Sequence, residues 1–395
     1  MKIFVVGAGA TGSVLINALV KEKGVSQILC LSRNRRAAEE FVRPTAKVKI
    51  LSGDVKNIRR ISLLAKGSKV VVNAASPWLN IEVMKLALSV GAHYQDLEAY
   101  LGFDNGISRQ PYAIEHLAFE KEFKGRGLVA LFDAGAAPGL TNLLVASAAD
   151  RLGSLGTVKI RLIEDLKSSI LISGWSPQAA LDEVYSRPVK YENGKYRLIS
   201  RFSDSEEFYF PKPFGKRITY SIMNNEAFTL PKYLKVKNAE VRSAGSDDEV
   251  ARLMVGLGLL DKKPVHIHGA VVTPLEFLMK ILPSPPTPKE LNHLLSKGLI
   301  KDAAFAAHLE ITPADGRGKK FSQWVVFASQ RNLYKRKIYN TYIAYPAGLC
   351  AAAFTLEFPY IKTPGVVPPE GLLRYNRENI LKRIKKFGIK IRGRT

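Results

Sequence analysis

The chain has 395 residues, of which 46% are hydrophobic and 24% charged, and its formal net charge is +24. This length exceeds one typical domain and this composition can build sizeable hydrophobic cores, which argues against a globally disordered chain. The sequence holds only two cysteines, Cys30 and Cys350, which argues against a disulfide-stapled fold and favours a cytoplasmic location.

The strong positive charge is compatible with three kinds of partner: anionic small ligands, nucleic acid, or water around a lysine-rich surface. The basic residues are spread along the chain, with local density at 331–337 and 374–394. No nucleic-acid-binding motif accompanies them, so we expect no nucleic-acid partner. No stretch reaches the roughly 18 apolar residues of a membrane helix, so we expect no membrane contact either.

A dinucleotide-binding pattern opens the chain. A short apolar strand at residues 3–6 runs into G-x-G-x-x-G, and an apolar helix pattern follows at once. In such a loop the first glycine permits a tight turn, the second admits a pyrophosphate, and the third lets helix pack on strand. The order of strand, loop and helix favours a phosphate site over an ordinary tight turn. The predicted site comprises Gly7, Gly9, Ala10, Thr11 and Gly12.

The second strand, at residues 28–31, ends in a run that distinguishes the two nicotinamide cofactors. An acid at this position would hold the ribose 2′-hydroxyl of NAD, but residues 32–36 read S-R-N-R-R. Guanidinium groups can clamp a 2′-phosphate, so the run favours NADP over NAD. The alternative is that these arginines merely begin a solvated helix. The residues expected at the 2′-phosphate are Ser32, Arg33, Asn34 and Arg36.

Four further apolar segments, at 47–51, 69–73, 93–97 and 128–132, alternate with helical patterns. This alternation predicts an α/β fold with a doubly wound parallel sheet of Rossmann type. Ligands bind outside the carboxyl ends of such strands, which brings several loops to one crevice. Besides the glycine loop, the residues expected there are Asp54, Ala74, Ala75, Ser76, Gly135 and Pro138. Asp54 could instead cap the next helix.

The pattern changes after Asp133. A helix is expected at 140–152, followed by strands such as 158–163, in which apolar and basic residues alternate. Asn-Gly at 193–194 and Asp-Gly at 315–316 predict two hairpins. Capping boxes at 246–249 and 287–290 predict two helix starts. The central segment is therefore expected to be α+β with a mostly antiparallel sheet.

Motifs along the whole chain resemble the saccharopine dehydrogenase family, in particular the branch with saccharopine reductases, carboxynorspermidine dehydrogenases and lysine 6-dehydrogenases. They are GAGATG at 7–12, D-x-G-x-x-P-G-x-x-N at 133–142, W-S-P at 175–177, Y-P-x-G at 345–348 and TPGVVPP at 363–369. One departure is Ala137, which stands where saccharopine reductases carry Asp and where lysine-dehydrogenase-like members carry Ala.

The resemblance implies a discontinuous layout, with residues 1–134 and 345–395 forming the dinucleotide domain around a substrate and dimerisation domain at 135–344. It implies an NAD(P)-dependent oxidoreductase of the CH–NH class, acting on an amino acid or an amino-acid-derived imine such as saccharopine or a lysine-type substrate. The expected context is lysine metabolism, and the expected assembly is a homodimer. The alternative is a non-catalytic NADP-binding sensor or scaffold of the same fold.

The implied chemistry needs a proton relay and partners for the amine and carboxylate groups of the substrate. Candidates for the relay lie on the fifth strand and its exit; Asp96 is the first choice, beside His93, Glu98 and Tyr100. His93 could instead be a core histidine. The cations predicted to bind substrate carboxylates are Arg242 and Arg201, with Arg217 and Lys167 behind them.

Two further features leave alternatives open. Trp175 could line the substrate pocket or only pack the second domain. His266 and His268 lie on one face of a possible strand, but no third ligand stands at a recognised spacing. No metal site is therefore predicted.

Overall fold

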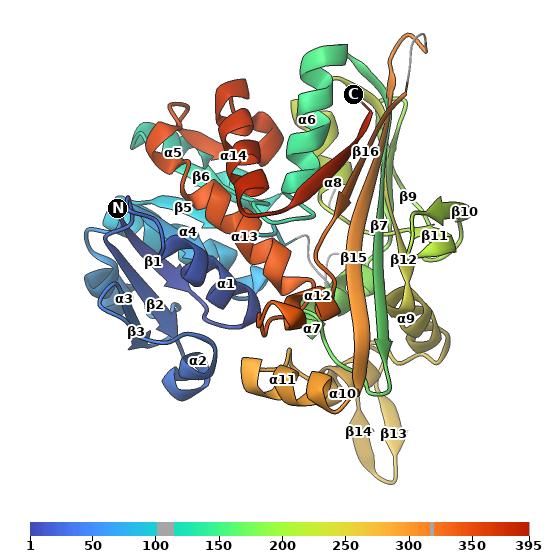
Figure 1. Cartoon of the computed structure of the whole chain (residues 1–395), viewed down its shortest axis with the longest axis horizontal. Helices are drawn as coiled ribbons and strands as arrows, with labels where there is room; N and C mark the ends of the chain where they lie inside the picture. The colour runs from blue at the N-terminus through green and yellow to red at the C-terminus, as the bar shows by residue number, and fades with distance from the viewer. Residues whose placement is uncertain (101–113, 317–319, 395) are drawn as a thin grey trace.

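The computed structural model describes residues 1–100, 114–316 and 320–394, which form two large sheets with helices packed between and around them (Figure 1). The first sheet has seven strands in the order β17-β6-β5-β4-β1-β2-β3, and all of its pairs are parallel. The expected parallel Rossmann-type sheet is thus confirmed. Its strands are β1 (Lys2–Val6), β2 (Gln27–Ser32), β3 (Val48–Ser52), β4 (Val70–Asn73), β5 (His93–Asp96), β6 (Val129–Leu131) and β17 (Gly365–Val367).

Helices cover both faces of this sheet, because its strands are apolar on both faces. Along β1, Ile3 and Val5 enter one core cluster, while Phe4 and Val6 enter another. Successive side chains of a strand point to opposite faces, so a strand without polar positions needs cover on both sides. The helices of this half are α1 (Ala10–Leu19), α2 (Arg35–Phe41), α3 (Ile58–Ala65), α4 (Asn80–Val90), α5 (Glu120–Gly125) and α13 (Ala344–Thr355).

The second sheet is mixed and nine-stranded, with a main path β10-β11-β12-β7-β15-β16-β18. Only the pairing of β12 with β7 is parallel among its described pairs, so the expected mostly antiparallel sheet is confirmed. Both predicted hairpins are present, as β8–β9 and β15–β16. The strands are β7 (Leu155–Ser168), β8 (Val189–Glu192), β9 (Lys195–Leu198), β10 (Ser205–Phe210), β11 (Gly215–Ser221), β12 (Val236–Gly245), β15 (Ile300–Pro313), β16 (Phe321–Val326) and β18 (Lys390–Arg394).

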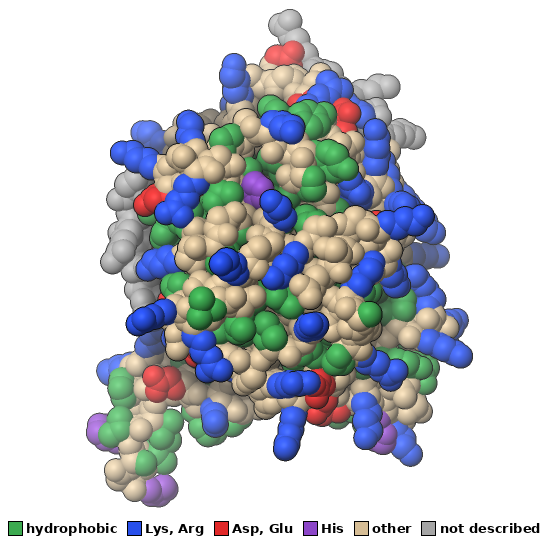
Figure 2. Space-filling view, turned by 90° about the vertical axis from the view of Figure 1, so that its left-hand side faces the viewer, with side chains coloured by type: hydrophobic (Ala, Val, Ile, Leu, Met, Phe, Trp, Pro, Cys, Tyr) green, Lys and Arg blue, Asp and Glu red, His purple; other side chains and the backbone are tan. Residues whose placement is uncertain are grey.

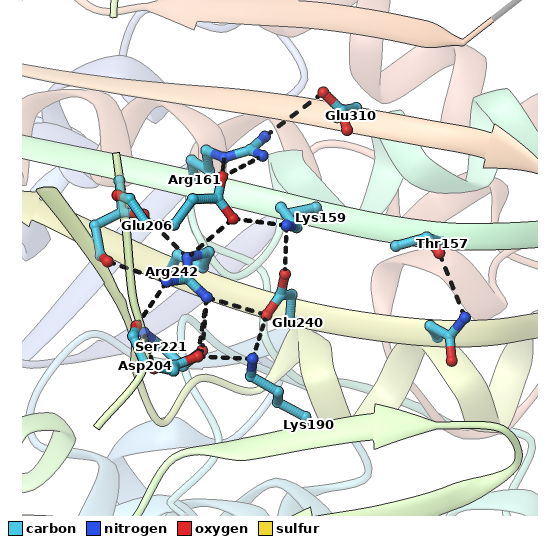
Figure 3. Close-up of polar contacts among 12 residues, drawn as sticks. Thr157, Lys159, Arg161, Lys190, Asp204, Glu206, Ser221, Glu240, Arg242 and Glu310 are labelled. Carbon is cyan, nitrogen blue, oxygen red and sulfur yellow. Dashed lines mark hydrogen bonds and ion pairs between the residues drawn. The ribbon is translucent and has the colours of Figure 1, made fainter. Parts of the chain in front are cut away.

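Strand β7 shows how the second sheet divides its faces. Val158, Ile160 and Leu162 are buried in the main core cluster, whereas Lys159 and Arg161 alternate with them on the opposite face and form ion pairs there (Figure 3). The helices of this half are α6 (Leu140–Leu152), α7 (Pro177–Tyr185), α8 (Glu226–Tyr233), α9 (Ser246–Gly256), α10 (Pro274–Ile281), α11 (Pro288–Ser296), α12 (Gln330–Lys335) and α14 (Arg374–Lys386). A separate two-stranded hairpin joins β13 (Val265–Ile267) to β14 (Ala270–Val272).

Of the two predicted capping boxes, one is confirmed and one is wrong. Thr287 Oγ1 accepts from the backbone N–H of Glu290 at 3.3 Å, and the Glu290 carboxylate accepts from the backbone N–H of Thr287 at 2.8 Å. Helix α9 instead has Gly245 at its N-cap, and Ser246 Oγ accepts from the backbone N–H of Leu166 at 2.8 Å. The Ser246 hydroxyl thus accepts from the neighbouring strand β7, and the N-cap position belongs to Gly245.

The C-terminal segment contributes to both sheets. β17 extends the first sheet beside β6, and α13 packs against α1. The last strand, β18, pairs with β16, so residues 390–394 extend the second sheet and not the first, and the domain boundaries of 1–134 with 345–395 stay a prediction. None of the helices that the structure describes is long and apolar enough to cross a membrane.

A single methyl group tests the packing of α13 on α1. A Cβ at Gly348 would lie 2.6 Å from the Val14 side chain and 2.7 Å from the Thr11 carbonyl oxygen, whereas a Cβ at Gly24 meets nothing within 4 Å. We expect Gly348→Ala to destabilise the fold by about 1–3 kcal/mol, or roughly 2–10 °C in melting temperature, because overpacking displaces backbone. Gly24→Ala is the matched control. Equal melting temperatures for the two variants would show that α13 does not press on α1.

Candidate active site

A cavity of about 720 Å³ lies at the carboxyl ends of the first sheet. Its walls come from the ends of β1, β2, β4 and β5, from the loop after β6, and from β7, α7 and β12 of the central segment. The cavity therefore has one side in each sheet. Parallel α/β sheets bind ligands at this edge.

The glycine loop forms one end of the cavity. Gly7 has a positive φ of 100°, and a Cβ there would lie 2.7 Å from the Ala75 nitrogen. Gly9, in contrast, has open space around its Cβ position and stands at the N-cap of α1 without a side-chain cap. Free N–H groups at this helix start face the cavity end, so the residues present fit a dinucleotide pyrophosphate.

The other predicted cofactor residues divide between the lining and its support. Gly12 lies beneath the loop, where a Cβ would come 2.4 Å from the Gly7 carbonyl oxygen. Its role is close packing of α1. The predicted residues that line the cavity are Gly7, Gly9, Ala10, Thr11, Ser32, Arg33, Asn34, Asp54, Ala74, Ala75, Ser76, Gly135 and Pro138.

The basic run after β2 offers one guanidinium to the cavity. Arg33 lines it, while Arg35 pairs with Glu39 at 2.7 Å on α2 and Arg36 lies on the same helix outside the lining. Asn34 caps α2 by accepting from the backbone N–H of Ala37 at 3.1 Å. Part of the run thus begins a helix, as the alternative supposed. Arg36, unlike Arg33, does not line the cavity.

The candidate relay residue Asp96 is buried and fully engaged. Its Oδ2 accepts from the Tyr94 hydroxyl at 2.8 Å and lies 2.7 Å from His116 Nε2, and its Oδ1 accepts from the backbone N–H of Asp133 at 2.9 Å. The residue is 1% exposed, although it touches the cavity wall. These contacts make Asp96 an anchor for the end of β5. His116, an unpredicted partner, follows in a short 3₁₀ turn at Glu115–Phe119.

Glu98, two residues further on, is better placed for proton transfer. It lines the cavity. Burial, together with the nearby charges of Asp182, Asp96 and Glu226, raises the pKa of its carboxyl to about 8. A carboxyl with a pKa near neutrality can both give and take a proton, which is what acid–base catalysis requires.

His93 and Tyr100 do not line the main cavity. His93 stands at the opposite, amino end of β5, where its Nδ1 accepts from the backbone N–H of Val129 at 3.0 Å and its ring stacks on Phe358. Burial, aided by the charge of Lys69, lowers its pKa. His93 is therefore half-buried and hydrogen-bonded at the end of β5 away from the cavity, which agrees with the alternative of a core histidine and not with a relay. Tyr100 lines a small adjoining cavity of about 20 Å³, next to Trp78.

Both arginines predicted to bind substrate are occupied elsewhere. Arg242 is 2% exposed on the polar face of the second sheet, where its Nη1 contacts Asp204 at 2.9 Å and Glu240 at 3.2 Å (Figure 3). Arg201 donates to the backbone carbonyl of Tyr185 and lies over its ring. Neither lines the cavity. For Arg242 the reason is strand alternation, because neighbouring positions on β12 point to opposite faces and Ser243 is the one that lines the cavity.

Of the remaining predicted residues, some line the cavity and others lie elsewhere. Arg217 pairs with Asp165 at 3.4 Å, and Lys167 is exposed on β7, so neither lines the cavity. Trp175 does line it, in the loop before α7. His266 and His268 are exposed on the β13–β14 hairpin. Among the residues that the structure describes, no group of three or more His, Cys, Asp or Glu could hold a metal ion.

Three cavity carboxylates were not predicted from the sequence. They are Glu164 on β7, Glu183 on α7 and Asp248 on α9. A usable signal existed for Glu164: it follows the buried Leu162 by two residues, so strand periodicity puts both on the cavity face. Glu183 and Asp248, which lie on helices, carried no such signal. The sequence does not distinguish a helical acid that faces the cavity from one that faces solvent.

Comparisons with known proteins agree along the whole chain. A family model described as the saccharopine dehydrogenase NADP binding domain matches residues 3–131, and one described as the saccharopine dehydrogenase C-terminal domain matches residues 135–389. Carboxynorspermidine synthase of Vibrio cholerae is 24% identical over 306 residues, and carboxyaminopropylagmatine dehydrogenase of Synechocystis is 25% identical over 295 residues; each match covers 72% of this chain and 73% of the relative. The solved apo saccharopine dehydrogenase (L-Glu forming) of Saccharomyces cerevisiae superimposes with a TM-score of 0.68 at 15% identity, with full coverage of both chains, and supports the fold.

The position of Glu98 predicts how stability depends on pH. Its folded-state pKa of about 8 lies above the ordinary value of 4.5, so between these two values the folded state holds a proton that the unfolded state has released. Stability must therefore fall as pH rises through this window. We expect Glu98→Gln to leave the melting temperature nearly unchanged at pH 4.5 and to raise it relative to wild type at pH 8.5. Glu39→Gln, at an exposed carboxylate, is the control. A Glu98→Gln variant whose melting curve tracks the wild type at both pH values would contradict this.

Proposed function

The chain belongs to the saccharopine dehydrogenase family, and we propose that it is an NADP(H)-dependent oxidoreductase that makes or breaks the C–N bond joining an amino acid to a diamine or polyamine. The observation that carries the substrate class is the charge of the cavity wall. Among the lining residues that the structure describes, six are acidic and Arg33 is the single cation. The names of two relatives, carboxynorspermidine synthase and carboxyaminopropylagmatine dehydrogenase, denote compounds with amines and a carboxyl group, which supports the proposal.

This replaces the saccharopine or lysine-type substrate expected from the sequence. Saccharopine carries several carboxylates, each of which needs a cationic partner when bound away from water. The two arginines expected to supply such partners, Arg201 and Arg242, do not line the cavity. An amine-rich substrate matches the acidic wall better.

The reaction we propose transfers a hydride between the cofactor and the carbon of an amine/imine pair. The nicotinamide supplies or accepts the hydride when NADP(H) is bound. The chain itself must bind the phosphates, orient the carbon and manage one proton. In the reductive direction the imine C=N accepts a hydride at carbon and a proton at nitrogen. Glu98, with its carboxyl protonated at neutral pH, is the proposed holder of that proton.

Cofactor choice follows from the end of β2. A 2′-phosphate carries nearly two negative charges at neutral pH, and Ser32 and Arg33 line the cavity at the end of β2. A hydrogen bond to a charged group contributes ~1.5–3 kcal/mol, so we propose a preference for NADP over NAD of roughly ten- to a few hundred-fold.

Substituting Ser32→Asp together with Arg33→Ala should reverse this preference, because the new carboxylate repels the phosphate and accepts from a free 2′-hydroxyl. Calorimetric titration of both cofactors at fixed salt measures it. Arg36→Ala, on α2 and outside the cavity lining, is the matched control and should leave the ratio unchanged. Wild type that binds NAD as tightly as NADP would refute the proposed preference.

The assignment of Glu98 is tested by turnover. We expect Glu98→Gln to lower kcat for NADPH-dependent reductive coupling of an amine to an amino-acid aldehyde by roughly 10²–10⁴-fold, because the amide cannot exchange the proton. Cofactor affinity should stay within about two-fold of wild type, and Glu39→Gln should leave kcat unchanged. An equal kcat for Glu98→Gln and wild type would remove Glu98 from the mechanism. Tight NADPH binding by wild type with no turnover of any amine would favour a non-catalytic NADP-binding protein.

A further inference from the structure

The cavity is acidic in a protein that is otherwise strongly basic. The chain carries a formal charge of +24, and Figure 2 shows Lys and Arg side chains scattered over the face that it presents. Inside, Arg33 and Asp54 lie at the adenosine end of the cavity, next to the glycine loop. The described lining of the central-segment side has no Lys or Arg, and it contributes Glu164, Glu183 and Asp248. The two ends of one cavity thus suit ligand groups of opposite charge.

These three carboxylates line the cavity and do not form a patch of acids on the outer surface. Each comes from a different element, β7, α7 or α9. Asp248 is 8% exposed, and its Oδ2 accepts from Ser243 Oγ at 2.8 Å. Glu183 accepts from the Nδ2 of Asn224, which is 4% exposed, at 3.5 Å. Neutral side chains that also line the cavity, Ser243 and Asn224, therefore orient the two carboxylates.

Grouping these acids in one cavity is electrostatically costly without a cation. Burial raises the pKa of Glu183 well above its ordinary value, and the charges of Glu98, Glu164, Glu226 and Asp248 add to the effect. Like charges that share a site oppose each other's ionisation. A bound ammonium group reverses this balance, because it pairs with several carboxylates at once.

We infer that Glu164, Glu183 and Asp248 form a subsite for a second ammonium group of the substrate, one that takes no part in hydride transfer. This inference rests on the proposed function and extends it, since it requires a substrate with at least two amines. The reacting nitrogen lies beside Glu98 at the end of β5, and the distal ammonium lies among the three carboxylates. An alkylammonium stays charged at neutral pH, since its ordinary pKa is about 10. A monoamine of the same length leaves the subsite unneutralised.

The test compares α,ω-diamines of three to five carbons with n-alkylamines of the same length. Each amine is titrated calorimetrically into the full chain saturated with NADP⁺, at pH 7.5 and fixed salt. We expect the best diamine to bind roughly ten- to a hundred-fold tighter than its matched monoamine. Glu183→Gln and Asp248→Asn should each remove about ten-fold of diamine affinity and leave monoamine affinity within two-fold. Glu207→Gln, an exposed carboxylate on β10, is the matched control.

The outcomes separate this inference from the proposed function. Equal affinity of wild type for diamine and monoamine, or equal losses for both amines in Glu183→Gln, would overturn the subsite. Because binding needs no turnover, diamine selectivity without NADPH oxidation would uphold the subsite and refute only the proposed reaction. If Glu183→Gln or Asp248→Asn fails to fold, Glu164→Gln provides another variant, whose folding is checked by thermal melting. This variant too must lose affinity for the diamine and keep its affinity for the monoamine.

Discussion

Helix α1 lies against backbone on two sides, and the cofactor end of the cavity depends on this packing. On one side a Cβ at Gly12 would lie 2.4 Å from the Gly7 carbonyl oxygen, and on the other a Cβ at Gly348 would lie 2.7 Å from the Thr11 carbonyl oxygen. Glycine at both contacts lets the helix start press on the turn that faces the phosphates. Because Gly348 belongs to α13, a segment far along the chain supports the first loop. That segment continues into β17 of the first sheet and β18 of the second, so it also ties the two walls of the cavity together.

The second organising feature is the separation of charge along the cavity. At the end of the cavity that suits anionic phosphates, the lining offers a helix start and one guanidinium. At the end toward the central segment, the lining offers carboxylates. The cations that could have neutralised those carboxylates are used on the other face of the second sheet. There Lys159, Arg161 and Arg242 pair with Glu206, Glu240 and Asp204 (Figure 3). Ion pairs on one face of the sheet and cavity-lining carboxylates on the other allow a basic protein to keep an acidic site.

The sequence predicted the parts of this arrangement that depend on local pattern. Apolar runs such as residues 3–6 identified the parallel strands, and the glycine spacing identified the phosphate loop, because each pattern has few other structural uses. The direction in which a side chain points was harder to predict from the sequence. Arg242 and Ser243 are neighbours, and only the observed pairing of β12 shows which of them faces the cavity. His93 begins a correctly predicted strand, but its role as hydrogen-bond acceptor for Val129 could not be predicted, because it depends on a residue 36 positions later. Glu183 gave no signal, because its partners come together only in the folded chain.

The most direct test of the account is a crystal structure of the chain with NADP⁺ and a diamine bound together. We expect the 2′-phosphate to lie beside Arg33 and a diamine nitrogen to lie within about 3.2 Å of a carboxylate oxygen of Glu183 or Asp248. The other nitrogen should lie beside Glu98. A diamine bound outside the cavity, or a carboxyl group of a substrate seated among these carboxylates, would contradict the claim that one cavity joins an NADP site to a site for a cationic amine.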